Sequence, residues 1–180
     1  AVANLSTKLD ALTAKAAVAK LDVPSILKGA VTWDKYGAFV ITGDIPNMWV
    51  RDSIASVLPF CGSFRHLCES VLKRTAMYIK VAPYANSYRK LPRNAVNAEE
   101  RKLHREGWVA TYNYELDSGC YWLLLWETLG SPERYSSTMR LLVDLWSREP
   151  TYEYPEVTKR MRHVNQSSGL IWSAFRPSDD

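Results

Sequence analysis

Residues 41–53 read Ile-Thr-Gly-Asp-Ile-Pro-Asn-Met-Trp-Val-Arg-Asp-Ser, so one short segment holds two carboxylates, a guanidinium and an indole. Its glycine and proline favour a loop, and loops held by a rigid scaffold often carry binding groups. The last ten residues, 171–180, combine Trp, Arg and Asp again. We therefore predict that two segments far apart in the sequence build one polar ligand site.

The composition favours a folded chain. With 180 residues, of which 47% are hydrophobic and 23% charged, the chain is long enough to bury a core as one domain or as part of a larger one. Seven Trp and ten Tyr either fill that core or line a groove for flat ligands such as sugar rings. Core packing is the simpler interpretation for most of them.

The formal charge is +4, and the most basic part is residues 65–105. This pattern is typical of a solvated surface, which could meet an acidic partner, and no motif indicates nucleic acid. No run of eighteen apolar residues and no secretory signal occurs, so neither a membrane span nor secretion is expected.

The three cysteines, Cys61, Cys68 and Cys120, show no C-x-x-C spacing, and there are only three histidines. We therefore expect neither a disulfide framework nor a zinc site, and no cofactor. A reducing compartment inside the cell, cytoplasmic or organellar, fits this cysteine usage best.

Hydrophobic periodicity predicts an amphipathic helix over residues 1–22 and further helices over 48–60, 63–80, 108–128 and 132–146, separated by proline and glycine. Apolar and polar side chains alternate over residues 30–41, which predicts a short β hairpin with its turn at 34–37. Residues 89–107 are charged and are expected to be a surface excursion. Helices joined as hairpins indicate an all-α fold with one short β excursion.

Each polar motif taken alone has a structural alternative. Asp44, Arg51 and Asp52 fit an ion-pair cluster as well as a ligand site. Glu115 and Asp117 lie two apart, so in a regular helix they would point to different faces, and one of them could cap the helix. Asn86 also fits an ordinary turn residue.

Taken together, the motifs resemble a known family. Residues 40–53, Val-Ile-Thr-Gly-Asp-Ile-Pro-x-Met-Trp-x-Arg-Asp-Ser, resemble the first signature of glycoside hydrolase family 125, the metal-independent exo-α-1,6-mannosidases. Three further segments follow in the family's order: 83–86 (Pro-Tyr-Ala-Asn), 114–121 (Tyr-Glu-Leu-Asp-Ser-x-Cys-Tyr) and 169–180 (Gly-x-Ile-Trp-Ser-x-Phe-Arg-Pro-Ser-Asp-Asp). The resemblance thus spans residues 40–180.

The resemblance implies an (α/α)6 barrel of helix hairpins over residues 23–180, with the site in its mouth, and inverting hydrolysis of terminal α-1,6-linked mannose without a metal. In such hydrolysis one carboxylic acid protonates the leaving oxygen while a second carboxylate activates a water. The resemblance makes Asp180, in preference to Asp179, the general acid. The residues it places around the mannose are Asp44, Trp49, Arg51, Asp52, Asn86, Glu115 and Arg176.

In the family the general base is a Glu far downstream of the position of Asp180, and the helices predicted here are about half of the twelve that a closed barrel needs. We therefore expect an incomplete barrel. Two hypotheses follow: a mannoside hydrolase seen without its C-terminal half, or a truncated, inactive subunit whose open helical face is covered by a protein partner. Local departures from the family's pattern include Ala82 and Gly119.

Overall fold

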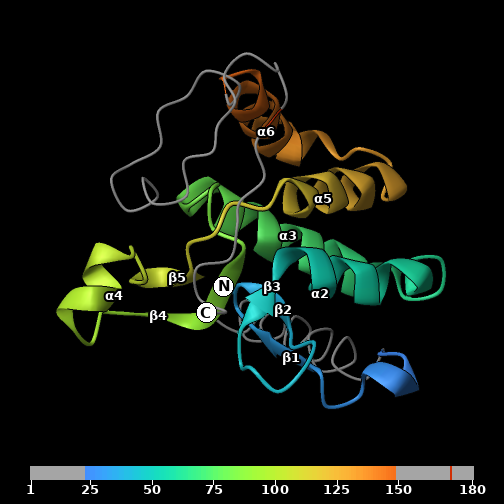
Figure 1. Ribbon diagram of the computed structural model, residues 1–180. Coiled ribbons are helices and arrows are strands. Elements are labelled where there is room, and N and C mark those ends of the chain that lie inside the picture. The colour runs from blue at the N-terminus through green and yellow to red at the C-terminus, as the bar shows by residue number, and fades with distance from the viewer. Residues whose placement is uncertain (1–22, 149–170, 172–180) are drawn as a thin grey trace, which may run out of the picture.

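The computed structural model describes residues 23–148 and residue 171. The predicted N-terminal helix and most of the final segment, including Arg176, Asp179 and Asp180, lie outside the described residues. In the described part, four longer helices are accompanied by two small antiparallel sheets (Figure 1). The helices are α2 (Val50–Val57), α3 (Arg65–Val81), α5 (Leu116–Thr128) and α6 (Ser136–Arg148). None of the helices described is both long and apolar enough to cross a bilayer.

The predicted hairpin is confirmed. After a short 3-10 helix, η1 (Ser25–Leu27), strand β1 (Val31–Asp34) pairs with β2 (Gly37–Val40). Gly37 has a φ of +120°, and a Cβ built there would lie 2.7 Å from the Ser70 carbonyl oxygen. Glycine is therefore required at this turn for its conformation and for its close contact with α3.

The helix hairpin that follows is also confirmed. Strand β3 (Met48–Trp49) leads directly into α2 (Val50–Val57), then η2 (Leu58–Phe60) and α3 (Arg65–Val81). Pro59 lies within η2 and ends the α-helical run. Helix α3 buries an apolar side that includes Leu67, Val71 and Leu72.

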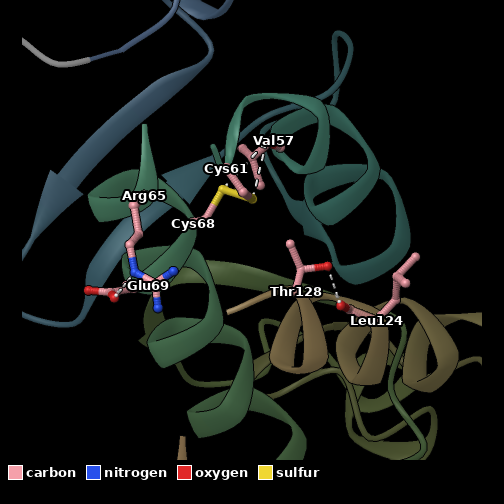
Figure 2. Close-up of a disulfide and its surroundings, with 7 residues drawn as sticks. All are labelled: Val57, Cys61, Arg65, Cys68, Glu69, Leu124 and Thr128. Carbon is pink, nitrogen blue, oxygen red and sulfur yellow. Dashed lines mark hydrogen bonds and ion pairs between the residues drawn. A yellow bond between two sulfur atoms is a disulfide. The ribbon is translucent and has the colours of Figure 1, made fainter. Parts of the chain in front are cut away.

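The cysteine prediction was wrong. Cys61 and Cys68 form a disulfide between the end of η2 and the first turns of α3 (Figure 2), and both side chains are buried. The pair was missed because the two residues meet only when the chain reverses between these helices. The expectation of a reducing compartment used the lack of a disulfide as its argument, so it loses that support. Cys120 is free and exposed.

Residues 87–111 contain more β structure than predicted. Strand β4 (Ser87–Arg93) pairs with both β3 and β5 (Gly107–Thr111), and the short helix α4 (Ala98–Lys102) joins β4 to β5. The predicted helix at 108–128 therefore begins late, as α5 (Leu116–Thr128). The all-α prediction holds for the helical hairpins but omits this three-stranded sheet.

Helix α5 packs against α2 and α3, and α6 (Ser136–Arg148) also contacts α3 (Figure 1). A 3-10 turn, η3 (Glu133–Tyr135), connects α5 to α6. Gly119 allows the close approach of α6, because a Cβ at that position would lie 2.7 Å from the Trp146 ring. On α6, Leu142 and Leu145 are buried, whereas Val143 is 44% exposed.

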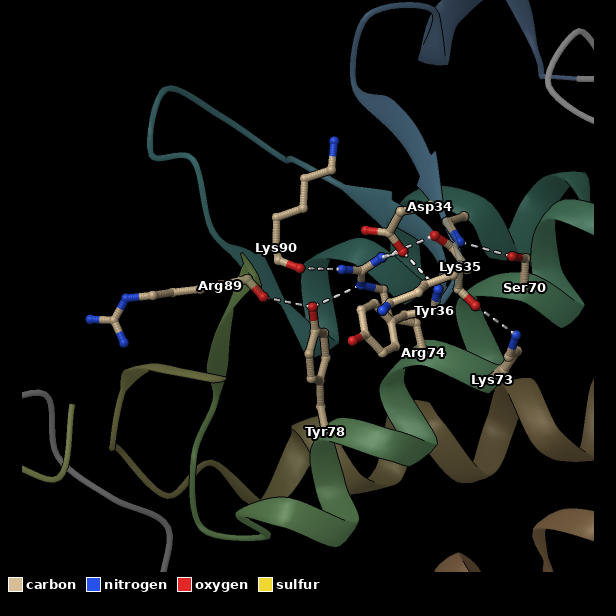
Figure 3. Close-up of polar contacts among 11 residues, drawn as sticks. Asp34, Lys35, Tyr36, Ser70, Lys73, Arg74, Tyr78, Arg89 and Lys90 are labelled. Carbon is tan, nitrogen blue, oxygen red and sulfur yellow. Dashed lines mark hydrogen bonds and ion pairs between the residues drawn. The ribbon is translucent and has the colours of Figure 1, made fainter. Parts of the chain in front are cut away.

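Arg74 joins the hairpin, α3 and β4 in one buried network (Figure 3). It is fully buried, and its guanidinium donates to the Asp34 carboxylate at 2.8 Å and to the carbonyls of Gly37 and Lys90. Its Nε donates to the Tyr78 hydroxyl, which in turn donates to the Arg89 carbonyl. Burial of Tyr78 raises its pKa to about 12. The network therefore fixes β4 against the helices.

Candidate substrate site

Arg51 is brought to its place by backbone pairing. Trp49 pairs with Ser87 between β3 and β4, and the Val50 amide donates to the Asn86 carbonyl at 3.1 Å. Arg51 is the next residue along, in the first turn of α2. The loop of residues 41–47 therefore ends with Arg51 beside the start of β4.

Three carboxylates surround the Arg51 guanidinium. Its Nη1 donates to Asp117 Oδ2 at 2.8 Å and lies 3.5 Å from Glu115 Oε2, while Nη2 lies 3.4 Å from Asp52 Oδ2. The hydrogen bond with Asp117 raises the pKa of Arg51, the charges of the carboxylates add to this, and partial burial opposes it. One cation among three carboxylates leaves acceptor oxygens in excess of donors at this point of the molecule.

The regular helix through both Glu115 and Asp117, on which their predicted divergence depended, is not formed. Glu115 lies just before α5, with an extended backbone of φ −123° and ψ 114°, so the angular spacing of a helix does not apply to it. Its side chain is only 8% exposed, and Asp117 follows in the first turn of the helix. Because the helix begins between them, both carboxylates reach Arg51.

Asn86 is held by a chain of hydroxyl groups. Thr111 Oγ1 donates to Asn86 Oδ1 at 2.7 Å and lies 2.6 Å from Ser87 Oγ. Since the single hydroxyl proton of Thr111 goes to Asn86, the Ser87 hydroxyl must donate to Thr111. Asn86 is 1% exposed and Ser87 is fully buried.

This arrangement fixes which end of the Asn86 amide is free. Its oxygen is used by Thr111, and within the described residues its Nδ2 is buried without a hydrogen-bond partner. A buried donor without an acceptor costs about 1–3 kcal/mol. In the same part of the chain, Asn113 Nδ2 and Asp117 Oδ1 are also buried without partners. These three atoms are available to a hydroxylated ligand.

The structure brings three of the predicted residues together, since Asp52 and Glu115 lie at the Arg51 guanidinium. A fourth, Asn86, is held next to them along the backbone by the hydrogen bond from the Val50 amide. Trp49 is half-buried and precedes them in β3. Asp44 is exposed, and no hydrogen bond or ion pair within residues 23–148 joins it to Arg51. Arg176, Asp179 and Asp180 are outside the described residues.

Sequence reasoning missed Thr111 and Ser87 as supports of Asn86, and set Asp117 aside. The signal for Asp117 was its place in the motif of residues 114–121, whereas a threonine and a serine on paired strands leave no signature along the chain. Among the described residues, no group of three or more His, Cys, Asp or Glu side chains is arranged to hold a metal ion.

Comparisons with known proteins agree on one relationship. A sequence model of the metal-independent α-mannosidases, GH125, matches residues 14–149. Among solved structures, the chain is similar to a Streptococcus pneumoniae protein of a family of metal-independent α-mannosidases, solved as a non-productive substrate complex with α-1,6-mannobiose. That match has a TM-score of 0.64 and 25% identity, and it covers 98% of this chain and 50% of the other, so this chain spans about half of that protein's length. No curated protein matches this chain.

Proposed function

The chain belongs to glycoside hydrolase family 125, the metal-independent α-mannosidases. From this premise we propose that it supplies the substrate-binding residues of an exo-acting α-mannosidase. The proposed reaction is the release of terminal α-1,6-linked mannose with inversion. The corresponding architecture is an incomplete (α/α)6 barrel. The family match and the similarity to a mannosidase that was solved with α-1,6-mannobiose support this proposal.

The observation that carries the proposal is the Arg51 cluster beside Asn86. A mannose hydroxyl both donates and accepts hydrogen bonds, so its recognition needs charged donors and acceptors side by side. Arg51 and the Asn86 amide supply donors, while Asp52, Glu115 and Asp117 supply acceptors. A buried amide nitrogen without a partner is uncommon in folded proteins, and here it stands beside the charged cluster.

The chemistry requires two further carboxyl groups. We assign the general acid to Asp180, in preference to Asp179, with Arg176 next to the sugar. Inversion requires a base about 6.5–9.5 Å from the acid, with room for a water on the opposite face of the ring. The family's base is a Glu downstream of this position, so the full-length polypeptide would provide it.

The proposal is tested by incubating the full-length polypeptide with α-1,6-mannobiose and following the anomeric signals by proton NMR. We expect free mannose to appear first as the β anomer, at a rate that a chelator does not change. Asp180→Asn should abolish turnover and still bind the disaccharide. Absence of mannose release by the wild type would refute the function, whereas full activity of Asp180→Asn would refute only the assignment of the acid.

A further inference from the structure

The end of β4 and the segment that leads to β5 carry a net positive charge. Residues 89–106 contain six basic and three acidic side chains, a formal +3, against +4 for all 180 residues. In Figure 1 this excursion, with α4 at its tip, extends away from the stacked helices. Among the described residues, the ion pairs of its arginines are those of Arg89 and Arg93 with Glu100.

Of the three acidic side chains in this segment, Glu100 is the one that pairs with its arginines, and both of its oxygens are used. Both of its oxygens accept from the Arg93 guanidinium, at 2.8 and 2.9 Å, and one also accepts from the Val96 amide. The Arg93 hydrogen bonds, followed by that of the Val96 amide, lower the pKa of Glu100 to about 2. Glu100 thus has little capacity left for another arginine.

Among the described residues, the Arg89 guanidinium has no adequate acceptor. Its side chain is 13% exposed, and Nη2 lies 3.9 Å from Glu100 Oε1, beyond hydrogen-bond distance. Nη1 is buried without a hydrogen-bond partner in this part of the chain. Figure 3 shows its guanidinium directed away from the Arg74 network, which uses only the Arg89 carbonyl. Burying a guanidinium is unfavourable unless an anion accepts its hydrogen bonds.

Neighbouring charges increase this deficit. Burial lowers the pKa of Arg89, and the positive charges of Arg93 and Arg105 lower it further, opposed by Glu100. Within the described residues, no ion pair or side-chain hydrogen bond engages the Arg105 guanidinium. Three arginines around one glutamate leave a local charge of +2.

We propose that Arg89, Arg93 and Arg105 form an anion site that binds a phosphate group. A phosphate monoester carries close to two negative charges at neutral pH and three acceptor oxygens, so it matches both the charge and the forked donors of the site. A carboxylate would neutralise only half of the excess charge.

The position of the site identifies the kind of phosphate. Arg89 follows Ser87 by two residues in β4, a separation of about 6.6 Å along a strand, and Ser87 supports Asn86. Arg89 therefore lies on the same strand as the residue that supports Asn86 in the proposed mannose site. The ligand would be a phosphorylated mannoside, and this part of the inference rests on the proposed function.

The first experiment does not depend on that function. Inorganic phosphate is titrated calorimetrically, at constant ionic strength, into the full-length wild type, Arg89→Gln and Arg101→Gln. Arg101 is exposed on α4 in the same segment, so its variant removes the same charge from a surface position. We expect saturable binding that Arg89→Gln weakens at least tenfold and Arg101→Gln by less than twofold. Absence of saturable binding, or equal weakening in both variants, would overturn the site.

The second experiment compares mannose 6-phosphate with inorganic phosphate on the wild type. Tighter binding of the sugar phosphate supports the phosphorylated mannoside, whereas equal binding overturns that part and leaves a site for free phosphate. If Arg89→Gln fails to fold, the site is tested instead by the melting temperature of the wild type with added phosphate. A saturable increase with phosphate, at constant ionic strength, supports the site, and no increase contradicts it.

Discussion

Replacing Thr111 by Val tests whether the hydroxyl chain holds the Asn86 amide. Valine has nearly the shape of threonine but removes the donor to Asn86 Oδ1 and the acceptor of the Ser87 hydroxyl. Asn86 is 1% exposed and Ser87 is fully buried, so water cannot readily replace either bond. Each buried group left unsatisfied costs about 1–3 kcal/mol, and we expect the free energy of unfolding to fall by about 2–5 kcal/mol.

The same change should weaken substrate binding, because the Asn86 amide is free to rotate and its Nδ2 is no longer aimed. Loss of one neutral hydrogen bond of about 1 kcal/mol corresponds to an increase in KM of about 5- to 10-fold on α-1,6-mannobiose. The matched control is Thr111→Ser, which keeps the hydroxyl. It should restore KM to within about twofold even if the lost methyl group costs some stability.

The assays are denaturant unfolding of the three proteins and initial rates over a range of mannobiose concentrations. A Thr111→Val protein as stable as the wild type, with an unchanged KM, would refute the reasoning. Equal loss of binding in Thr111→Val and Thr111→Ser would show that packing, and not the hydroxyl, supports Asn86.

Four further outcomes are expected. Arg74→Met removes the guanidinium donor from a carboxylate, two carbonyls and a hydroxyl, and should lower the free energy of unfolding by about 3–5 kcal/mol. A loss below about 1 kcal/mol in denaturant titration would contradict the network. Gly119→Ala places a methyl 2.7 Å from an indole of α6 and should cost about 1–3 kcal/mol, and an unchanged melting temperature would argue against this contact. Under non-reducing denaturation, thiol titration should detect Cys120 alone, and three reactive thiols would show that the disulfide is absent. Folding raises the pKa of Tyr78 from 10.0 to about 12, so the neutral hydroxyl contributes fully to stability below pH 10. That contribution is lost as the pH rises to about 12, and denaturant unfolding at a series of alkaline pH values measures the loss.

The positions of the main helices and of the first hairpin could be predicted from the sequence because their causes are local. Helix α3 follows from its apolar period of three to four residues, and the turn at 34–37 follows from alternation around a glycine. Arg51, Asp52, Asn86 and Glu115 were selected because they lie in motifs that resemble one family, and the family model confirms that resemblance. Sequence analysis alone therefore indicated the family and part of the candidate site.

Tertiary structure decided the features that depend on pairing between distant segments. The sheet of β3, β4 and β5 forms because strands far apart in the chain satisfy each other's backbone hydrogen-bonding groups. Residues 89–107 are polar and show no alternation of apolar and polar side chains that would predict a strand. Cys61 and Cys68 meet because the chain reverses between η2 and α3. Asp117 joins Glu115 at Arg51 because α5 begins between them. In each case the stabilising interaction is made with a residue in another element of the fold, so the local sequence does not predict it.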